Sequence, residues 1–219
     1  MTNILLAGVG GQGTVLAAKL LATAAANKGW QVRTAETIGM AQRGGSVVSH
    51  VRMADGGGEV LAPLIPRGQA DLIVAFEPGE AARALPYLSR HGLIVSAMTT
   101  VQPVTSALSG EPYNADDILR GIQTELYNGS VRSASARNHG LRQGRGHHPQ
   151  LFNAELVCVD DAAALRRLGA SRKMLNTVML TAALSKGRVP LTVDDLREAI
   201  PHVIKEQHVA ANLRATELL

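Results

Sequence analysis

The chain has 219 residues, of which 46% are hydrophobic and only 3% aromatic, and its formal net charge is +4. This length suits one domain with a substantial core, and the small positive charge gives no signal for nucleic-acid binding. The single cysteine, Cys158, excludes an intramolecular disulfide. It also excludes an iron–sulfur cluster held by this chain alone, because clusters normally take four thiolates. No apolar run reaches the roughly 20 residues that span a bilayer, so we expect a cytoplasmic protein without membrane contact.

The first predicted unit is a strand, a glycine-rich turn and a helix. Residues 4–6 are an apolar run, and residues 14–27 are rich in alanine and leucine. The turn between them follows the spacing of the dinucleotide-binding fingerprint, and its members are Gly8, Gly10, Gly11, Gln12 and Gly13. Such a turn directs free backbone N–H groups, at the positive end of a helix dipole, into one crevice. Alternatively, the glycines only shape the connection between strand and helix.

A second glycine-rich loop, at residues 39–45, follows a short predicted strand at residues 31–35. We group four of its members with the first turn, as loops that face a cofactor or an active site: Gln42, Arg43, Gly44 and Gly45. Arg43 is always charged and offers five donors to a carboxylate or a phosphate. Alternatively, Arg43 pairs with Glu36 and braces the loop. Glu36 falls about where dinucleotide-binding proteins carry the acid that binds the ribose.

An antiparallel hairpin is predicted next. Residues 46–53 have the composition of a strand, residues 55–58 form a turn, and residues 59–62 form a short second strand. His50 alternates with strand valines, which favours an ordinary strand histidine over a catalytic one.

Three further apolar runs predict strands of a mainly parallel sheet, and they lie at residues 71–76, 93–96 and 156–159. The first of them, a continuous apolar run, is expected to be a central strand. Pro78 starts a helix that we expect to continue to about residue 88, since proline is tolerated in the first helical turn. Asn114 is placed to cap the next helix. Cys158 lies within the last apolar run and is expected to be buried there.

The composition changes between residues 128 and 150. This segment lacks acidic residues and contains four arginines and three histidines, namely Arg132, Arg137, Arg142, Arg145, His139, His147 and His148. We expect a flexible basic insertion that forms a mobile surface loop. Two alternatives are a phosphate-gripping role for the arginines and a metal site at the adjacent histidines. RNA binding is not favoured, because no aromatic residues are interleaved for base stacking.

Regular structure is predicted again in the last third of the chain. A helix follows Asp160 and ends near Gly169, and another covers residues 172–185. Asn176 in the latter either has a functional role or satisfies buried backbone groups. Thr192 caps a further helix, and residues 203–213 form the last one.

The paired motifs carry a resemblance to a known family. They are GVGGQG at residues 8–13, MAQRGGS at residues 40–46, HVR at residues 50–52 and PLIP at residues 63–66, followed by Ala70-Asp71 and Glu77-Pro78. Together they resemble the gamma-type subunit of 2-oxoacid:ferredoxin oxidoreductases. The branch with the greatest likeness is the small (beta) subunit of indolepyruvate:ferredoxin oxidoreductase.

The resemblance implies an α/β fold: one three-layer, Rossmann-like domain over residues 1–219, with a mainly parallel sheet and helices on both faces. It implies a non-catalytic subunit that contributes no catalytic residue and no metal ligand. A large partner subunit would hold thiamine diphosphate, magnesium and 4Fe-4S clusters, and would pass electrons to ferredoxin. Coenzyme A would be a cosubstrate of the complex, and the isolated chain would be inactive.

The alternative is a stand-alone NAD(P)-binding protein of the Rossmann type. The second glycine-rich loop argues against it, because that loop occupies the position where the ribose of a dinucleotide would lie. Binding of NADH by the isolated chain distinguishes the two hypotheses.

Overall fold

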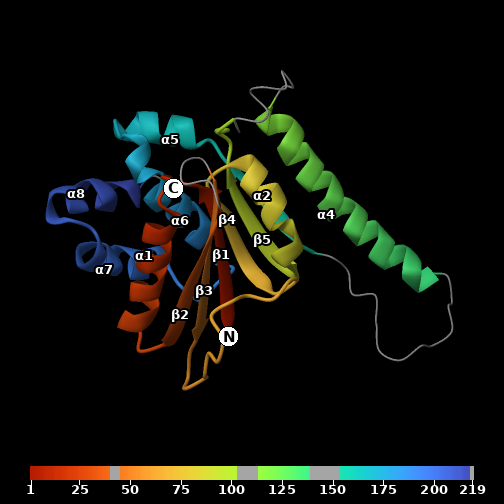
Figure 1. Ribbon diagram of the computed structural model, residues 1–219, viewed down its shortest axis with the longest axis horizontal. Helices are drawn as coiled ribbons and strands as arrows, with labels where there is room; N and C mark the ends of the chain where they lie inside the picture. The colour runs from red at the N-terminus through yellow and green to blue at the C-terminus, as the bar shows by residue number, and fades with distance from the viewer. Residues whose placement is uncertain (40–44, 103–112, 139–152, 218–219) are drawn as a thin grey trace.

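One six-stranded sheet organises the protein, which we describe from a computed structural model that places residues 1–39, 45–102, 113–138 and 153–217 (Figure 1). The strand order is β2-β3-β1-β4-β5-β6. The strands are β1 (Thr2–Val9), β2 (Gln31–Ile38), β3 (Ser46–Ala54), β4 (Ala70–Ala75), β5 (Leu88–Ala97) and β6 (Glu155–Val159).

Only β3 runs against the other strands. β1 pairs in parallel with β4, β4 with β5, and β5 with β6, whereas β3 is antiparallel to both of its neighbours, β1 and β2. The sheet is therefore mainly parallel, which confirms the predicted α/β class. The carboxyl ends of five strands meet at one edge, where ligands bind in open sheets of this kind.

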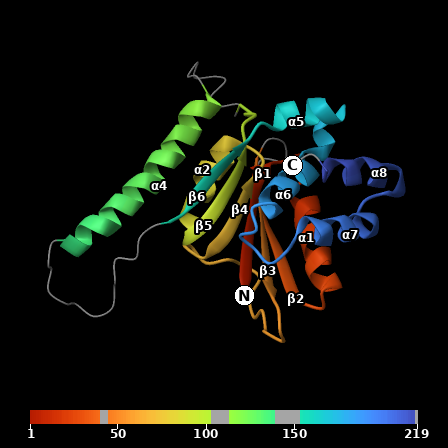
Figure 2. The same ribbon diagram turned by 180° about the vertical axis from the view of Figure 1, so that it is seen from behind.

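Helices cover both faces of the sheet, which gives the predicted three layers. Helices α1 (Thr14–Asn27), α6 (Leu175–Leu184) and α7 (Val193–Val203) pack on one face, and α2 (Pro78–Ala84) and α4 (Ala115–Asn138) on the other. Helix α2 packs on β1, β4 and β5, and α4 contacts β6. The view from behind shows the opposite face of the sheet, with α6 and α7 (Figure 2). Helices α5 (Asp161–Leu168) and α8 (Glu206–Ala215) pack against α6. Two 3-10 turns, Leu85–Tyr87 and Arg172–Met174, complete the set.

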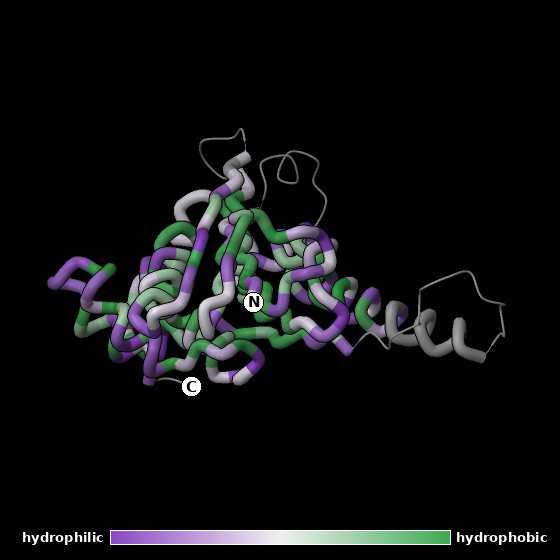
Figure 3. The backbone as a smooth tube through the Cα atoms, turned by 90° about the horizontal axis from the view of Figure 1, so that it is seen from below, coloured by the Kyte–Doolittle hydropathy of each residue, from purple (hydrophilic) through white to green (hydrophobic). Residues whose placement is uncertain are grey.

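The core consists of the alternating side chains of the central strands and the helices that cover them. In β4, Leu72 and Val74 face α1 and α6, whereas Ile73 faces α2 and α4. These strands are buried on both faces, as the apolar runs predicted, and they form the hydrophobic centre of the tube in Figure 3. Every residue of helix α6 is buried, so this helix lies at the centre of the core together with β1.

Several predicted helix ends are confirmed by their hydrogen bonds. Asn114 Oδ1 accepts from the N–H of Asp116 at 2.9 Å, and Gly169 ends α5 with a φ of 58°. Thr192 and Asp195 form a reciprocal capping box at the start of α7. These local signals were readable because each needs only residues within one turn of the chain.

The predicted second strand of the hairpin, residues 59–62, is wrong. This segment is irregular, and side chains hold its backbone in place of a strand partner. The N–H of Val60 donates to the side chain of Gln31, and Arg33 donates to the carbonyl of Val60 at 2.6 Å. Arg52 binds the carbonyl of Ala62 at 2.8 Å. Instead, β3 has its antiparallel partners in β1 and β2.

The helix after Pro78 is shorter than predicted, because α2 ends at Ala84 and β5 already begins at Leu88. Pro86 lies between them and supplies no N–H to continue a helix. At the start of the basic segment, the backbone of residues 128–138 continues α4 and is not a loop. The remaining expectations for that segment fall on residues 139–152, which lie outside the described residues.

Candidate functional site

The first glycine-rich turn joins β1 to α1 at the carboxyl end of the central strand. Gly11 and Gly13 have φ angles of 96° and 84°, a left-handed backbone that glycine adopts easily because it lacks a Cβ atom. Gly13 is the N-cap of α1, and no side chain caps this end of the helix. The first N–H groups of α1 therefore lack an intrahelical partner and lie at the positive end of its dipole.

Gly8 and Gln12 hold this turn together from the inside. A Cβ atom on Gly8 would lie 2.9 Å from Gln12 Oε1 and from Thr14 Cγ2, so a larger residue there would have to displace these side chains. The side chain of Gln12 accepts from the N–H of Val9 at 2.7 Å and donates to the carbonyl of Phe76 at 3.0 Å. Gln12 thus ties the ends of β1 and β4 together, and its amide is directed into the protein.

The base of the second glycine-rich loop lies beside the first turn. Gly10 N–H donates to the carbonyl of Gly45 at 2.9 Å, and Gly39 N–H donates to the carbonyl of Ser46 at 2.8 Å. Three of the predicted site residues, Gln42, Arg43 and Gly44, lie outside the described residues. Within the described residues, the bond from Gly10 to Gly45 is what connects the two motifs, and their assignment to one site stays a prediction.

The strand order around this turn differs from that of a dinucleotide-binding crevice. In such a crevice the acidic residue stands at the end of the strand that is next to the first one. Here β3 lies between β1 and β2, and Glu36 is an exposed residue of β2 opposite Ser49 of β3. Neighbouring strands are about 4.8 Å apart, so Glu36 is displaced by one strand from the position that would bind a ribose next to the turn.

A buried pair of acidic residues supports the base of the second loop. One of them, Glu80, was not predicted from the sequence. Glu77 and Glu80 are 1% and 2% exposed. Ser46 Oγ donates to Glu80 Oε2 at 2.5 Å, and Arg83 forms an ion pair with the same carboxylate. The only available signal was the Glu77-Pro78 start of α2, with Glu80 three residues after the N-cap.

Glu77 extends this network toward α4. Its Oε2 accepts from the N–H of Glu80 at 2.9 Å, and its Oε1 accepts from the hydroxyl of Tyr113 at 2.9 Å. Burial, together with the hydrogen bond to Glu77, raises the pKa of the Tyr113 phenol above its usual range. Tyr113 therefore stays protonated and acts as a donor to Glu77 at physiological pH.

His50 is an ordinary strand histidine, as predicted. It is 3% exposed, its Nδ1 accepts from the N–H of Ile65 at 3.2 Å, and its ring meets Tyr87 edge-on at 5.9 Å. Burial lowers the pKa of His50. The imidazole is thus neutral and fixes the segment that carries Ile65.

A basic groove of about 510 Å³ opens beside the first turn, on the side of α1, α6 and α8. Gly11, Gln12 and Gly13 form one end of it. Its basic residues are Lys173, Lys205 and His208, and the lining contains no acid. Asn176, which the sequence singled out, is 2% exposed and lies on its floor. The lysines were not predicted, because they come from two distant segments of the chain.

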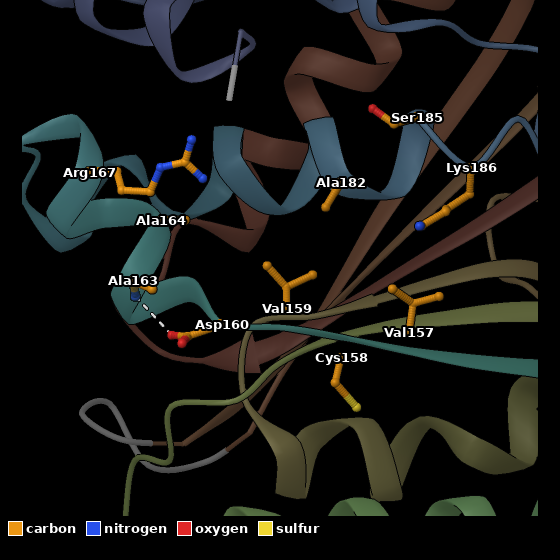
Figure 4. Close-up of a pocket in the computed structure, with 10 residues that line it drawn as sticks. All are labelled: Val157, Cys158, Val159, Asp160, Ala163, Ala164, Arg167, Ala182, Ser185 and Lys186. Carbon is orange, nitrogen blue, oxygen red and sulfur yellow. Dashed lines mark hydrogen bonds between the residues drawn. The ribbon is translucent and has the colours of Figure 1, made fainter. Parts of the chain in front are cut away.

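A second groove, of about 450 Å³, lies between β6 and helices α5 and α6 (Figure 4). Val157 and Val159 point into it, whereas Cys158 points to the opposite side of β6. Cys158 is exposed, which corrects the predicted burial: β6 is an edge strand, and α4 covers it only in part. Partial burial of the thiol, with the charge of Asp116, raises the pKa of Cys158, so the thiol is protonated at neutral pH.

Other site chemistries are not found in the described part of the chain. There, no group of three or more His, Cys, Asp and Glu side chains could hold a metal ion. No helix among these same residues is both long and apolar enough to cross a membrane.

The fold and the paired loops define a Rossmann-like α/β subunit with a glycine-rich turn at the carboxyl edge of its sheet. The chain belongs to the pyruvate ferredoxin/flavodoxin oxidoreductase family, whose model matches residues 3–218. Two curated relatives are each named indolepyruvate oxidoreductase subunit IorB. The relative from Methanothermobacter thermautotrophicus is 34% identical over 97% of this chain and 93% of its own length. The relative from Thermococcus kodakarensis is 32% identical over 99% and 93%.

Solved structures show the same fold. The gamma subunit of a keto/oxoacid ferredoxin oxidoreductase from Geobacter sulfurreducens aligns with a TM-score of 0.61 at 20% identity, covering 100% of this chain and 95% of that one. The 2-oxoglutarate:ferredoxin oxidoreductase from Magnetococcus marinus, solved with 2-oxoglutarate, coenzyme A and succinyl-CoA, aligns with a TM-score of 0.62 at 16% identity. The alignment covers 99% of this chain but 30% of that one, so the fold also occurs as part of a longer chain.

Proposed function

We propose that this chain is the small, non-catalytic subunit of a cytoplasmic 2-oxoacid:ferredoxin oxidoreductase, with indolepyruvate or another aryl pyruvate as substrate. The observation that carries the proposal is the match, along 97% or more of the chain, to relatives named as indolepyruvate oxidoreductase subunits. The hydrogen bond from Gly10 to Gly45 supports it, because it brings the base of the second loop next to the first turn at the carboxyl edge of the sheet.

The redox chemistry belongs to a large partner subunit. There the 2-oxoacid loses its carboxyl group as CO2, the acyl group is joined to the sulfur of coenzyme A, and two electrons pass to ferredoxin. Thiamine diphosphate with magnesium supplies the electron sink for decarboxylation when it is bound, and 4Fe-4S clusters carry the electrons. One cysteine in 219 residues cannot supply the four thiolates of such a cluster, so the partner must hold it.

The two glycine-rich loops face the active site of that partner in the proposed complex. The network from Ser46 to Glu80 fixes the base of the second loop, and the bond from Gly10 to Gly45 fixes its distance from the first turn. Arg43 is then the side chain proposed to bind an anion, namely a carboxylate or a phosphate of the reactants.

The test is reconstitution with the partner subunit, identified by mass spectrometry of the native complex. We expect no oxidation of indolepyruvate by the isolated chain, and reduction of ferredoxin when chain, partner and coenzyme A are mixed. A panel of aliphatic and aromatic 2-oxoacids then assigns the substrate. Full activity of the isolated chain, or of the partner without it, contradicts the proposal. Tight NADH binding by the isolated chain would instead support the stand-alone alternative.

A further inference from the structure

The two edges of the sheet differ in how they are protected from pairing with another chain. The edge strands are β2 and β6. Arg33 and Glu36 are exposed charged residues of β2, and charges of this kind oppose the addition of a further strand. β6 is apolar from Leu156 to Val159 and contains neither lysine nor proline. No segment that the structure describes pairs with its outer side, so β6 is an open edge of the kind that proteins usually cover.

Leu156 and Cys158 supply the backbone groups of this open edge. On the inner side, the carbonyl of Val159 accepts from the N–H of Met98 at 3.0 Å and continues the ladder between β5 and β6. Successive residues of a strand direct their N–H and C=O groups to opposite sides, so those of Leu156 and Cys158 point away from β5. Each of these two residues therefore offers one donor and one acceptor to an added strand.

The second groove, of about 450 Å³, opens beside this edge, between β6 and the helices α5 and α6 (Figure 4). Val157 and Val159 point into it from β6. The helices contribute small apolar side chains to its walls, namely Ala163, Ala164 and Ala182. A strand added to β6 would place every second side chain on this face of the sheet, where the groove has room for apolar groups.

The groove also carries two cations that lack a counter-ion. Arg167 and Lys186 lie at opposite ends of it, with their charged groups directed inward (Figure 4). Both are exposed, and neither forms an ion pair with a residue that the structure describes. One acid, Asp160, belongs to the lining, and its carboxylate already caps α5 by accepting from the N–H of Ala163 at 2.8 Å. The lining is therefore net positive, which is complementary to a segment that carries an acidic side chain.

The groove lies at the same edge of the sheet as the two glycine-rich loops. Asp160 follows the carboxyl end of β6, just as the first turn follows the carboxyl end of β1. In the strand order, only β4 and β5 lie between β1 and β6. A large partner whose active site faces the loops therefore reaches the open edge of β6 as well.

We propose that the open edge of β6 and the groove beside it bind an extended segment of the large partner subunit. The segment adds a seventh strand to the sheet and pairs with the backbone of Leu156 and Cys158. Its apolar side chains fill the groove, and an acidic side chain pairs with Arg167 or Lys186. The inference rests on the proposed function, which requires such a partner, and it names the surface that holds the partner.

One pair of variants tests the open edge. Cys158→Pro removes an outward N–H but no hydrogen bond to β5, and proline is tolerated in edge strands at such positions. In the reconstituted complex we expect Cys158→Pro to raise the dissociation constant about tenfold or more, because the added strand loses a donor and meets the proline ring. Cys158→Ala keeps the N–H and should bind as the wild type does. Interferometry with the immobilised large subunit measures both variants.

Charge variants test the groove without altering β6. The combination of Arg167→Glu and Lys186→Glu should weaken binding of the large subunit about tenfold or more, because attraction to the acidic side chain becomes repulsion. Arg166→Glu is the matched control, since Arg166 is the preceding exposed arginine in the last turn of α5 and does not line the groove. It should bind as the wild type does. These variants decide the matter even if Cys158→Pro lowers stability, because all three side chains are exposed.

Hydrogen exchange locates the added strand. The amides of Leu156 and Cys158 should exchange about tenfold more slowly in the complex than in the isolated chain. The amide of Val157 faces β5 and should be protected in both. Mass spectrometry with fragmentation to single residues measures the three amides.

The outcomes separate this inference from the proposed function. If the wild-type chain does not bind the large subunit, the proposed function fails, and this inference fails with it. If the wild type binds, but the variants bind equally tightly and exchange at residues 156 and 158 is unchanged, this inference alone is overturned. Light scattering on the isolated chain tests for another occupant. A dimer that Cys158→Pro separates would assign the edge to a second copy of the chain and overturn the proposal.

Discussion

His50 shows how a conspicuous residue can serve the fold alone. Its burial lowers its pKa, so the folded protein holds the neutral ring while the unfolded chain takes up a proton below about pH 6.5. Above this pH both states are neutral and the His50 contribution is constant. As the pH falls below it, the unfolded state binds more protons, and stability is lost until the pH reaches the folded pKa.

We therefore expect the free energy of unfolding to fall between pH 7.5 and pH 5.5, by at most about 1.4 kcal/mol per pH unit from this group. In His50→Asn, which cannot be protonated, this pH-dependent loss should shrink. His91→Asn, at an exposed histidine, should keep the wild-type profile. Urea unfolding at the two pH values measures the free energy of unfolding of all three proteins. The same pH dependence in His50→Asn and the wild type would contradict a lowered pKa of His50 in the folded protein.

At Gly8, the lack of room for a Cβ atom determines how a substitution changes the stability. An alanine there would place its methyl group 2.9 Å from Gln12 Oε1 and from the buried Thr14. The side chain of Gln12 cannot move away freely, because its amide makes two hydrogen bonds. We expect Gly8→Ala to destabilise the protein by about 1–3 kcal/mol. Gly121→Ala is the control, because no atom lies within 4 Å of the new methyl group in the middle of α4.

The control should raise stability by about 0.4–1 kcal/mol, since alanine favours a helix and restricts the unfolded chain. Chemical denaturation of both variants and of the wild type shows whether each substitution lowers or raises the free energy of unfolding. A neutral effect of Gly8→Ala would show that the turn can relax around the methyl group.

Arg43 is the residue at which the proposed complex is most directly tested. Arg43→Lys keeps the charge but loses the planar pair of donors. In the assembled complex we expect kcat/KM to fall about ten- to hundredfold, as for the loss of a bidentate contact to a charged group worth about 1.5–3 kcal/mol. Arg90→Lys, at the amino end of the sheet, should have no effect. Wild-type kinetics for both Arg43→Lys and Arg43→Ala would remove Arg43 from the site.

At the scale of elements, the first turn of α2 connects two segments that the chain separates widely. Glu80 holds Ser46 at the start of β3, and Glu77 holds Tyr113 next to the start of α4. We expect Ser46→Ala to cost about 1–3 kcal/mol of stability, because it leaves a lone pair of the buried carboxylate of Glu80 unsatisfied.

Ser185→Ala serves as the comparison, since Ser185 is exposed and its hydroxyl binds only the carbonyl of Thr181 in its own helix. It should change stability by less than about 0.5 kcal/mol. Thermal unfolding of both variants is sufficient. Equal, small effects would mean that Glu80 finds another donor, such as water, when Ser46 is removed.

The same scale shows which elements could be predicted from sequence. The apolar runs of β1, β4, β5 and β6, the glycine turn and the caps at Asn114, Gly169 and Thr192 are all local signals, and all are confirmed. The error at residues 59–62 has a different origin. That segment follows a glycine-rich turn, as the second strand of a hairpin would, but the side chains of Gln31, Arg33 and Arg52 bind its backbone groups. Side-chain contacts between residues so far apart in sequence leave no local pattern.

The candidate site was predictable only in part for the same reason. The glycines of the first turn and the Gly45 base of the second loop were visible as motifs. The Glu80–Ser46 pair and the lysines of the groove were not, because each depends on which elements the fold brings together. A motif reports what the backbone does locally, whereas a pocket depends on the tertiary arrangement.

At the scale of the whole molecule, the sheet is asymmetric about β1. On one side β1 meets the antiparallel β3, and on the other it meets the parallel β4. The glycine turn lies at the carboxyl end of this central strand, beside α1 and α6, and both faces of β1 are covered. The basic groove and the base of the second loop thus share one rigid support, although they lie on different sides of it.

The central place of β1 has a consequence for how the protein is made. Leu5 lies opposite His50 on one side and Ile73 on the other, so β1 is synthesised before both of the strands with which it pairs. Contacts over such separations form slowly, because the chain between them must first be ordered. Until β4 is synthesised, β1 is an apolar strand without its parallel partner, and such strands are prone to aggregate. We therefore expect the nascent chain to depend most on chaperones in the interval between the synthesis of β1 and that of β4.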